Sequence, residues 1–325
     1  MEKIKIGIVG FGNLGKGVFH AVQSSKDMEC TVVFTRRVDN VKKQTFGVPV
    51  VDVNNFTLLS SVKPDVVILC GGSKNDIPVQ GPQFAKMFNT VDSFDTHVCI
   101  PQYFKDMRNI ATENNHVSII STGWDPGLFS LMRVLFKSIL PQGKDYTFWG
   151  PGISQGHSDA IRTIPGVIDA RQYTIPIDEA INSVRSGINP ILSTREKHKR
   201  VCYVVVKNGA DKNKIERQIK EMPNYFADYD TDVDFVSCEE LKQKHFELPH
   251  GGFVINSATT GSYQQTLEFG LKLKSNPYFT GSVLVAYARA AYRLALQKKY
   301  GAYTVLEIPP ILLSPLEAED LMKMI

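Results

Sequence analysis

A glycine-rich loop near the N-terminus constrains the fold of this chain more than any other feature. Gly10-Phe11-Gly12-Asn13-Leu14-Gly15 has the spacing G-x-G-x-x-G, and it directly follows the apolar run at residues 4–9. A helical pattern at residues 14–25 comes next, so the motif has the strand-before, helix-after context of a dinucleotide fold. Gly10 permits a tight turn, Gly12 lets the backbone approach a pyrophosphate, and Gly15 lets helix and strand pack closely. The alternative is a glycine turn that binds nothing.

The remaining pattern predicts an α/β protein of two domains. Short β-branched runs alternate with helical stretches over the first 120 or so residues, as in a Rossmann-type doubly wound parallel sheet. We predict that residues 1–125 form a dinucleotide-binding domain and that residues 126–280 form an α+β domain for substrate binding and dimerisation. The segment from about 280 to 325 returns to the first domain in this interpretation. Within the second half, the pattern predicts a helix at 263–273 and a short strand at 304–308.

Composition excludes several classes of protein. The 325 residues are 43% hydrophobic and 22% charged, as in ordinary globular chains, and 37 basic against 33 acidic residues leave +4, which is no nucleic-acid footprint. The five cysteines include no C-x-x-C pair, which predicts a reducing compartment and no structural zinc. No spacing of His, Cys and Asp indicates a metal site. Without a signal peptide or a run of 18 apolar residues, we expect a cytoplasmic protein that does not enter a membrane.

The residues after the second predicted strand indicate which dinucleotide binds. An NAD enzyme usually has an acidic residue about 20 positions after the glycines, and this chain has Thr35-Arg36-Arg37 instead. One hydroxyl and two guanidinium groups suit the 2′-phosphate of NADP. The alternative is two solvent-exposed arginines in a loop, but their position favours the phosphate. We therefore predict NADP rather than NAD.

A second glycine-containing loop follows the third strand of the predicted sheet. Cys70-Gly71-Gly72-Ser73 lies where the carboxyl ends of parallel strands meet, and small residues there would let the nicotinamide half of the cofactor lie close. A plain strand-to-helix turn explains the same residues equally well.

Three further loops combine glycine with aromatic and hydrogen-bonding residues, as small-molecule pockets do. They are Ser121-Thr122-Gly123-Trp124-Asp125-Pro126-Gly127, the segment at residues 148–159, and Pro249-His250-Gly251-Gly252. Asp125 and Asp95 both lie in loops beside aromatic residues, so the two carboxylates could hold an ammonium group or accept its proton. A turn or a helix cap is the usual role of a single loop aspartate. Arg200 ends a basic run at the start of a predicted strand and is best placed to meet a carboxylate.

Together these residues closely resemble the meso-diaminopimelate dehydrogenase family over nearly the whole chain. The specific strings are Trp-Asp-Pro-Gly at 124–127, Phe-Trp-Gly-Pro-Gly at 148–152 and Ser-Gln-Gly-His-Ser-Asp at 154–159. The resemblance implies NADP-dependent oxidative deamination at the D-centre of meso-2,6-diaminopimelate, and a homodimer. The products would be L-2-amino-6-oxopimelate, which cyclises to tetrahydrodipicolinate, with ammonia and NADPH. In reverse, the reaction would supply lysine and cell-wall precursors.

The resemblance also implies roles for individual residues. Asp95 and Asp125 would hold the D-centre amine, with Trp124 beside them, and the backbone of residues 154–156 would hold the D-centre carboxylate. Other residues would contact the rest of the substrate, including its distal carboxylate. They are Trp149, Ser154, Gln155, Gly156, Thr174, Arg200, His250 and Asn276.

Other activities remain as alternatives at this point. A broader D-amino-acid dehydrogenase would differ only in loop contacts, and a dihydrodipicolinate reductase would leave Trp124, Asp125, Arg200 and His250 without a reason. A non-catalytic NADPH-binding sensor would need the glycine loop but not the paired aspartates.

Overall fold

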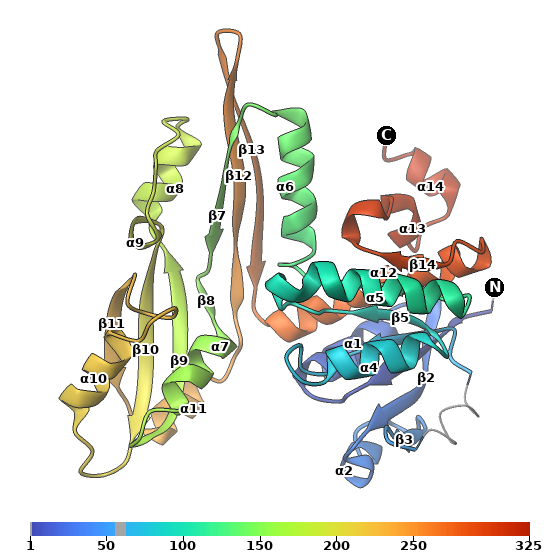
Figure 1. The fold of residues 1–325 in the computed structure, drawn as a ribbon, viewed down its shortest axis with the longest axis horizontal. Coiled ribbons are helices and arrows are strands. Elements are labelled where there is room, and N and C mark those ends of the chain that lie inside the picture. Colours follow the sequence, from blue (N-terminus) through green and yellow to red (C-terminus); the bar gives the residue numbers. More distant parts are fainter. Residues whose placement is uncertain (1, 56–62) are drawn as a thin grey trace. The chain divides into compact units, whose positions relative to one another are not determined.

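The computed structural model describes residues 2–55 and 63–325, and its contacts divide the chain into two compact units (Figure 1). Unit 1 consists of the chain up to Leu131 together with Pro277–Ile325, and unit 2 is Met132–Asn276. These divisions lie near 131 and 276, whereas the sequence pattern places them near 125 and 280.

Unit 1 is built on a seven-stranded sheet with the order β14-β6-β5-β4-β1-β2-β3. All of its neighbouring strands run parallel. The central strands are continuous apolar runs because helices cover both of their faces. The order reverses between β1 and β4, where a doubly wound sheet binds its ligand. The strands are β1 (Ile4–Val9), β2 (Met28–Thr35), β3 (Val50–Asp52), β4 (Val66–Leu69), β5 (Asn89–Asp92), β6 (Val117–Ile119) and β14 (Gly301–Tyr303).

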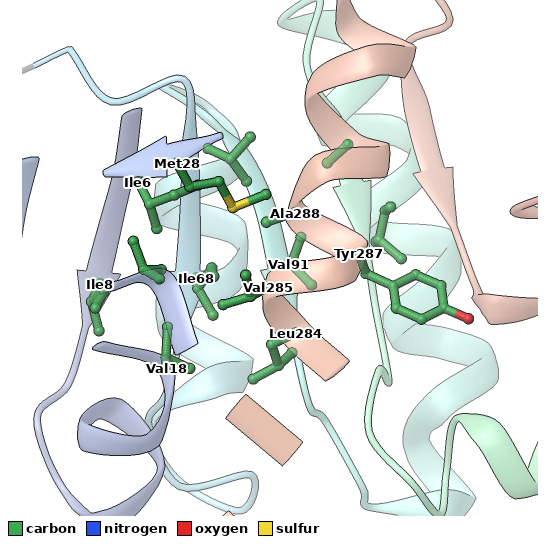
Figure 2. Packing of buried hydrophobic residues seen from close by; sticks show 14 of the residues in the cluster. Ile6, Ile8, Val18, Met28, Ile68, Val91, Leu284, Val285, Tyr287 and Ala288 are labelled. Atoms are coloured by element: carbon green, nitrogen blue, oxygen red, sulfur yellow. The ribbon is translucent and has the colours of Figure 1, made fainter. Parts of the chain in front are cut away.

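Two layers of helices enclose this sheet. α1 (Asn13–Gln23) and α12 (Asn276–Leu296) pack on one face, where Ile6, Ile8 and Ile68 meet Leu284 and Val285 in the largest apolar cluster (Figure 2). α4 (Ile77–Ala85) and α5 (Ile100–Glu113) cover the other face. α2 (Val38–Lys42) follows β2, and α13 (Pro310–Leu313) and α14 (Ala318–Met322) end the chain. This three-layer arrangement confirms the predicted fold class.

The helix α12 is held to unit 1 by a buried ion pair and by a close backbone contact. Arg289 is 4% exposed and donates to both carboxylate oxygens of Asp27, at 2.6 and 2.9 Å. The hydrogen bond from Arg289 lowers the pKa of Asp27. A Cβ on Gly281 would lie 2.6 Å from the backbone of Gly17 in α1, so only glycine allows the two helices to touch there.

Unit 2 contains two smaller sheets and the part of α6 (Leu128–Ile139) from Met132 onward. One sheet is antiparallel and joins β7 (Lys144–Trp149), β12 (His250–Thr260) and β13 (Tyr263–Leu273). The other joins β8 (Gly152–Ile153), β9 (Val167–Pro176), β10 (His198–Val206) and β11 (Asp230–Phe235), with only the last pair parallel. Its helices are α7 (Gln155–Arg162), α8 (Asp178–Arg185), α9 (Thr194–Lys197), α10 (Lys212–Lys220) and α11 (Cys238–Lys244).

Two predicted elements are wrong. The predicted helix at 263–273 is strand β13, because Leu267, Phe269 and Leu271 alternate with polar residues or glycine and the segment pairs with β12 along its whole length. The predicted strand at 304–308 is mainly a 3₁₀ turn at Val305–Glu307, because Thr304 and Glu307 form a capping box. The strand β14 lies just before it.

Candidate active site

The glycine loop adopts the geometry that the motif predicts. Gly10 has a φ of +88°, which favours glycine, and a Cβ on Gly15 would overlap the carbonyl oxygen of Gly10. A Cβ on Gly12 would meet nothing within 4 Å, so the loop is open at the position where a pyrophosphate approaches. Gly12 is also the N-cap of α1 and has no side chain to bond the first amides of that helix. Asn13, Leu14 and Gly15 form the first turn.

A cavity of about 370 Å³ lies against this loop and brings the three predicted cofactor segments together. It is lined by Gly10, Phe11, Gly12, Thr35, Arg36, Arg37, Cys70, Gly71 and Gly72, with Phe34, Val53, Asp76 and Gln80. The loops after β1, β2 and β4 meet here because the carboxyl ends of neighbouring parallel strands lie at one edge. The residues present therefore fit a dinucleotide.

The two arginines at the end of β2 are exposed, and both are tethered at the cavity. Arg36 Nη2 lies 3.2 Å from Asp76 Oδ1, although the Arg36 side chain is 68% exposed. Arg37 donates to the Phe11 carbonyl at 3.5 Å. The sequence analysis missed Asp76, whose carboxylate also accepts the amide of Gly72 at 2.9 Å. Its only signal was its place shortly after the Gly71-Gly72 turn.

The loops that carry Asp95 and Asp125 follow β5 and β6, which are neighbours in the sheet. Asp95 is exposed, and its amide donates to the Ser73 hydroxyl at 2.8 Å, which joins the Cys70–Ser73 loop to it. Trp124 is 8% exposed and makes an edge-to-face contact with Phe129, with ring centroids 5.2 Å apart. Asp125 is half-buried beside it. Unit 1 therefore presents both predicted carboxylates at the edge that forms the dinucleotide cavity.

In unit 2, the predicted carboxylate cradle is the first turn of α7. Ser154 is its N-cap, and the Ser154 hydroxyl lies 2.7 Å from His157 Nδ1. Gln155 and Gly156 are exposed at the helix start, and a Cβ on Gly156 would meet nothing within 4 Å. The amides of a first helical turn and the positive end of a helix suit a carboxylate.

Arg200 is a buried cation whose partners are neutral. It is 6% exposed, it hydrogen-bonds the Thr174 hydroxyl, and its guanidinium carbon lies 3.9 Å from the centre of the Tyr229 ring. Within residues 2–55 and 63–325, its buried Nε has no hydrogen-bond partner, and no carboxylate forms an ion pair with it. Burial lowers the pKa of Arg200. A buried guanidinium without a carboxylate is a strong candidate to bind an anionic group.

Strand register brings the predicted distal residues together. Arg200 pairs with Thr174 across β9 and β10, and Thr174 pairs with Gly152 across β8 and β9. A Cβ on Gly152 would lie 2.6 Å from His250, so His250 borders the same strand. Asn276, at the end of unit 2, donates its amide to the Leu248 carbonyl at 2.8 Å.

His198 is a neighbour of this site that the sequence analysis did not assign. Its ring stacks on Trp149 with centroids 5.5 Å apart, and its Nε2 accepts the Trp149 amide at 2.8 Å. Burial lowers the pKa of His198 to about 3, with help from the charge of Arg200, so the ring is a neutral acceptor. Burial likewise lowers the pKa of His157 to about 4.

Comparisons with known proteins agree with this geometry. The profile of the diaminopimelic acid dehydrogenase C-terminal domain matches residues 123–275. The meso-diaminopimelate D-dehydrogenase of Acetivibrio thermocellus is 56% identical over 325 residues, which cover 99% of this chain and 97% of that protein. The chain belongs to the meso-diaminopimelate dehydrogenase family. The resemblance drawn from the sequence is thus confirmed, and the protein is an oxidoreductase that acts on a CH–NH₂ group.

Solved structures extend the likeness to ligands. A mutant meso-diaminopimelate dehydrogenase from Clostridium tetani, solved with DAP, has 53% identity and a TM-score of 0.93, with 99% of both chains covered. An engineered D-amino acid dehydrogenase bound to NADP⁺ has 41% identity and a TM-score of 0.85, again with 99% of both chains covered. The family cofactor is NADP, as the Thr35-Arg36-Arg37 segment predicts.

Within residues 2–55 and 63–325, no group of three or more His, Cys, Asp or Glu side chains is arranged to hold a metal ion. None of its described helices is long and apolar enough to cross a bilayer.

The buried, neutral His198 makes the stability of the protein depend on pH. Its pKa of about 3 lies below the ordinary value of 6.5, so between these values the unfolded chain binds more protons. The stabilisation is complete above pH 6.5 and is lost as pH falls. We expect His198→Gln to lose about 2 kcal/mol less stability than wild type between pH 7 and pH 5, measured by urea unfolding. Exposed His97→Gln is the control, and equal pH dependence in all three proteins would contradict the assignment.

Proposed function

We propose that this chain catalyses the NADP-dependent oxidative deamination of meso-2,6-diaminopimelate at its D-centre. The substrate with its D-centre ammonium group, NADP⁺ and water give L-2-amino-6-oxopimelate, ammonium, NADPH and a proton, and the reaction is reversible. The observation that carries the proposal is the division of chemistry between the units. Unit 1 presents two carboxylates at the edge that holds a dinucleotide cavity, and unit 2 holds a buried guanidinium that has no carboxylate partner among the described residues.

The glycine loop and the two arginines would hold the cofactor in unit 1, the dinucleotide-binding domain. The open position at Gly12 and the first amides of α1 would meet the pyrophosphate. Arg36 and Arg37 would bind the 2′-phosphate, because guanidinium groups pair well with phosphate oxygens. The small residues Gly71 and Gly72 would let the nicotinamide half lie close. When bound, NADP⁺ accepts the hydride from the D-centre carbon.

Asp125 and Asp95 would bind the D-centre amine and accept a proton from it. The amine must lose a proton before the carbon–nitrogen double bond can form, so a carboxylate within hydrogen-bond reach can accept that proton. We assign the leading role to Asp125, which is half-buried beside Trp124, and a supporting role to exposed Asp95. Water then adds to the imine carbon, and ammonia leaves.

Unit 2 would bind the two carboxylates of the substrate as the substrate-binding domain. The backbone at Ser154, Gln155 and Gly156, with Trp149, suits the D-centre carboxylate. Arg200, with Thr174 and His250, suits the L-centre carboxylate, and Asn276 would contact the distal end. Because each end of the molecule meets a different set of groups, the site would prefer the meso isomer to the LL and DD isomers.

We also propose a cytoplasmic homodimer that works in lysine and peptidoglycan-precursor synthesis and binds no nucleic acid. All five cysteines are free, which suits a reducing compartment. Within unit 2, β13 is an edge strand, and α6 leaves Val134, Leu135 and Ile139 about half-exposed, at 48%, 45% and 55%. An association surface between copies would cover such groups.

The proposed reaction predicts a narrow pattern of substrates. We expect absorbance at 340 nm to rise when the protein meets NADP⁺ and meso-diaminopimelate, but not the LL or DD isomers. Turnover of D-alanine as well would favour the broader D-amino-acid dehydrogenase. No NADPH from any amine, in protein shown to bind the cofactor, would favour a sensor and contradict the proposal.

The proposed 2′-phosphate site predicts a selective loss in the arginine variants. Each charge-assisted bond to phosphate contributes about 1.5–3 kcal/mol, so Arg36→Ala and Arg37→Ala should each raise the KM for NADP⁺ roughly 10- to 100-fold. The KM for NAD⁺ should change little. Arg108→Ala, an exposed arginine on α5, is the matched control. An unchanged preference for NADP⁺ in a variant that combines Arg36→Ala and Arg37→Ala would exclude this role.

The proposed proton acceptor predicts a loss in kcat. Asp125→Asn keeps the size of the side chain but not its basicity, so kcat should fall about 10²- to 10⁴-fold while the Kd for NADPH stays unchanged. Asp106→Asn, an exposed aspartate on α5, is the control. Near-normal turnover by Asp125→Asn would show that another group takes the proton.

A further inference from the structure

Asp92 is a buried carboxylate that the proposed mechanism does not use. It is the last residue of β5, is 1% exposed and lies three positions before Asp95. The hydrogen-bond ladder between β5 and β6 ends at Val91 and Ile119. Beyond this point, strand pairing no longer holds the two segments together. The segment after β5 continues into the loop that carries Asp95, and the segment after β6 continues into the loop that carries Trp124 and Asp125.

The carboxylate of Asp92 bonds both of these loops. Its Oδ1 accepts the amide of Phe94 at 2.9 Å and the amide of Ser121 at 3.1 Å. Its backbone carbonyl accepts the amide of Thr122 at 2.8 Å. One residue thus replaces the missing ladder, with one bond to its own loop and two bonds to the loop that leads to Asp125.

The second oxygen is held by a buried tyrosine. Asp92 Oδ2 accepts the Tyr103 hydroxyl at 2.8 Å, and the Tyr103 ring lies 4.5 Å from that of Phe94. A Cβ on Gly81 of α4 would overlap the Tyr103 hydroxyl, so glycine at this position leaves room for the bond. Ile77, Met107 and Ile120 complete an apolar shell around the pair.

We propose that Asp92, with Tyr103 bonded to it, is a positioning residue that fixes the Asp95 loop relative to the Trp124–Asp125 loop. This inference rests on the proposed function, because it assumes that these loops carry the proton-handling carboxylates. Two carboxylates that act on one amine must keep a set separation, and a misplacement of about 1 Å can cost about 100-fold in rate.

The energetics support a role beyond stability. Burial raises the pKa of Asp92 to about 6, even though its hydrogen bonds act to lower it. The folded protein therefore binds this proton more tightly than the unfolded chain does, and stability decreases as pH rises from about 4 to 6. A carboxylate that is ionised at neutral pH at a cost in stability is retained for what it holds in place.

The test compares three variants at the pair, Asp92→Ala, Asp92→Asn and Tyr103→Phe. NADPH titration gives the number of folded sites and their Kd, and kcat for meso-diaminopimelate is expressed per NADPH-binding site. We expect Asp92→Ala to lower this kcat about 100-fold, with the Kd for NADPH unchanged. Asp92→Asn should recover most of the rate, because its amide oxygen can still accept both backbone amides. Tyr103→Phe should lose several-fold.

Two matched controls separate positioning from general destabilisation. Asp65 also accepts a backbone amide, that of Lys5 at 2.7 Å, but it lies at the amino ends of the strands. Tyr287 is another buried tyrosine, and its hydroxyl has no hydrogen-bond partner in the part of the chain that the structure describes. Asp65→Ala and Tyr287→Phe should keep a normal kcat per binding site.

The possible results are distinct. An inactive wild type that binds NADPH would refute the proposed function itself. An active wild type with an Asp92→Ala kcat within twofold of normal would overturn only the positioning role. If Asp92→Ala does not fold, Tyr103→Phe decides, and a normal kcat per binding site in that variant overturns the inference.

Discussion

The parallel direction of the strands in unit 1 is the constraint on which the rest of this half of the molecule depends. Parallel strands all end at one edge, so the loops after β1, β2, β4, β5 and β6 meet there although they are far apart in sequence. The loops after β1, β2 and β4 line the dinucleotide cavity. Those after β5 and β6 carry Asp95 and Asp125. The parallel direction of the strands therefore places this cavity and the two carboxylates at one edge of the sheet.

Two buried arginines, Arg289 and Arg200, differ in whether the protein supplies a carboxylate partner. The Arg289 guanidinium donates to the Asp27 carboxylate and to the Leu313 carbonyl, and these bonds attach α12 to the rest of unit 1. Arg200 is equally buried, but its partners within residues 2–55 and 63–325 are a hydroxyl and an aromatic ring. A buried charge without a counter-ion is costly, so it persists where a ligand supplies the missing charge. The contrast supports the proposal that Arg200 binds an anionic group of the substrate.

Features with a local signature could be predicted from the sequence, and those that depend on register could not. The glycine loop, Thr35-Arg36-Arg37 and the strands of unit 1 each carry their signal in adjacent residues, and the fold class follows from them. Asp76, Asp92 and His198 carry no such signal, because their partners, Arg36, Ser121 and Trp149, come from other elements. Strand β13 and the turn at Val305–Glu307 are exceptions, because their local signatures, an apolar–polar alternation and a capping box, compete with apolar spacings that also suit a helix and a strand.

The charge of Arg200 also governs the groups around it. Burial is the main reason for the low pKa of His157 and of His198, and the positive charge of Arg200 lowers both further. These rings are therefore neutral beside the buried guanidinium. His198 can then accept the Trp149 amide, and His157 can bond the Ser154 hydroxyl. A carboxylate bound to Arg200 would reduce its effect on both histidines. Because such coupling is reciprocal, carboxylate binding at Arg200 and protonation of His198 or His157 would affect each other. These two histidines contact Trp149 and the start of α7.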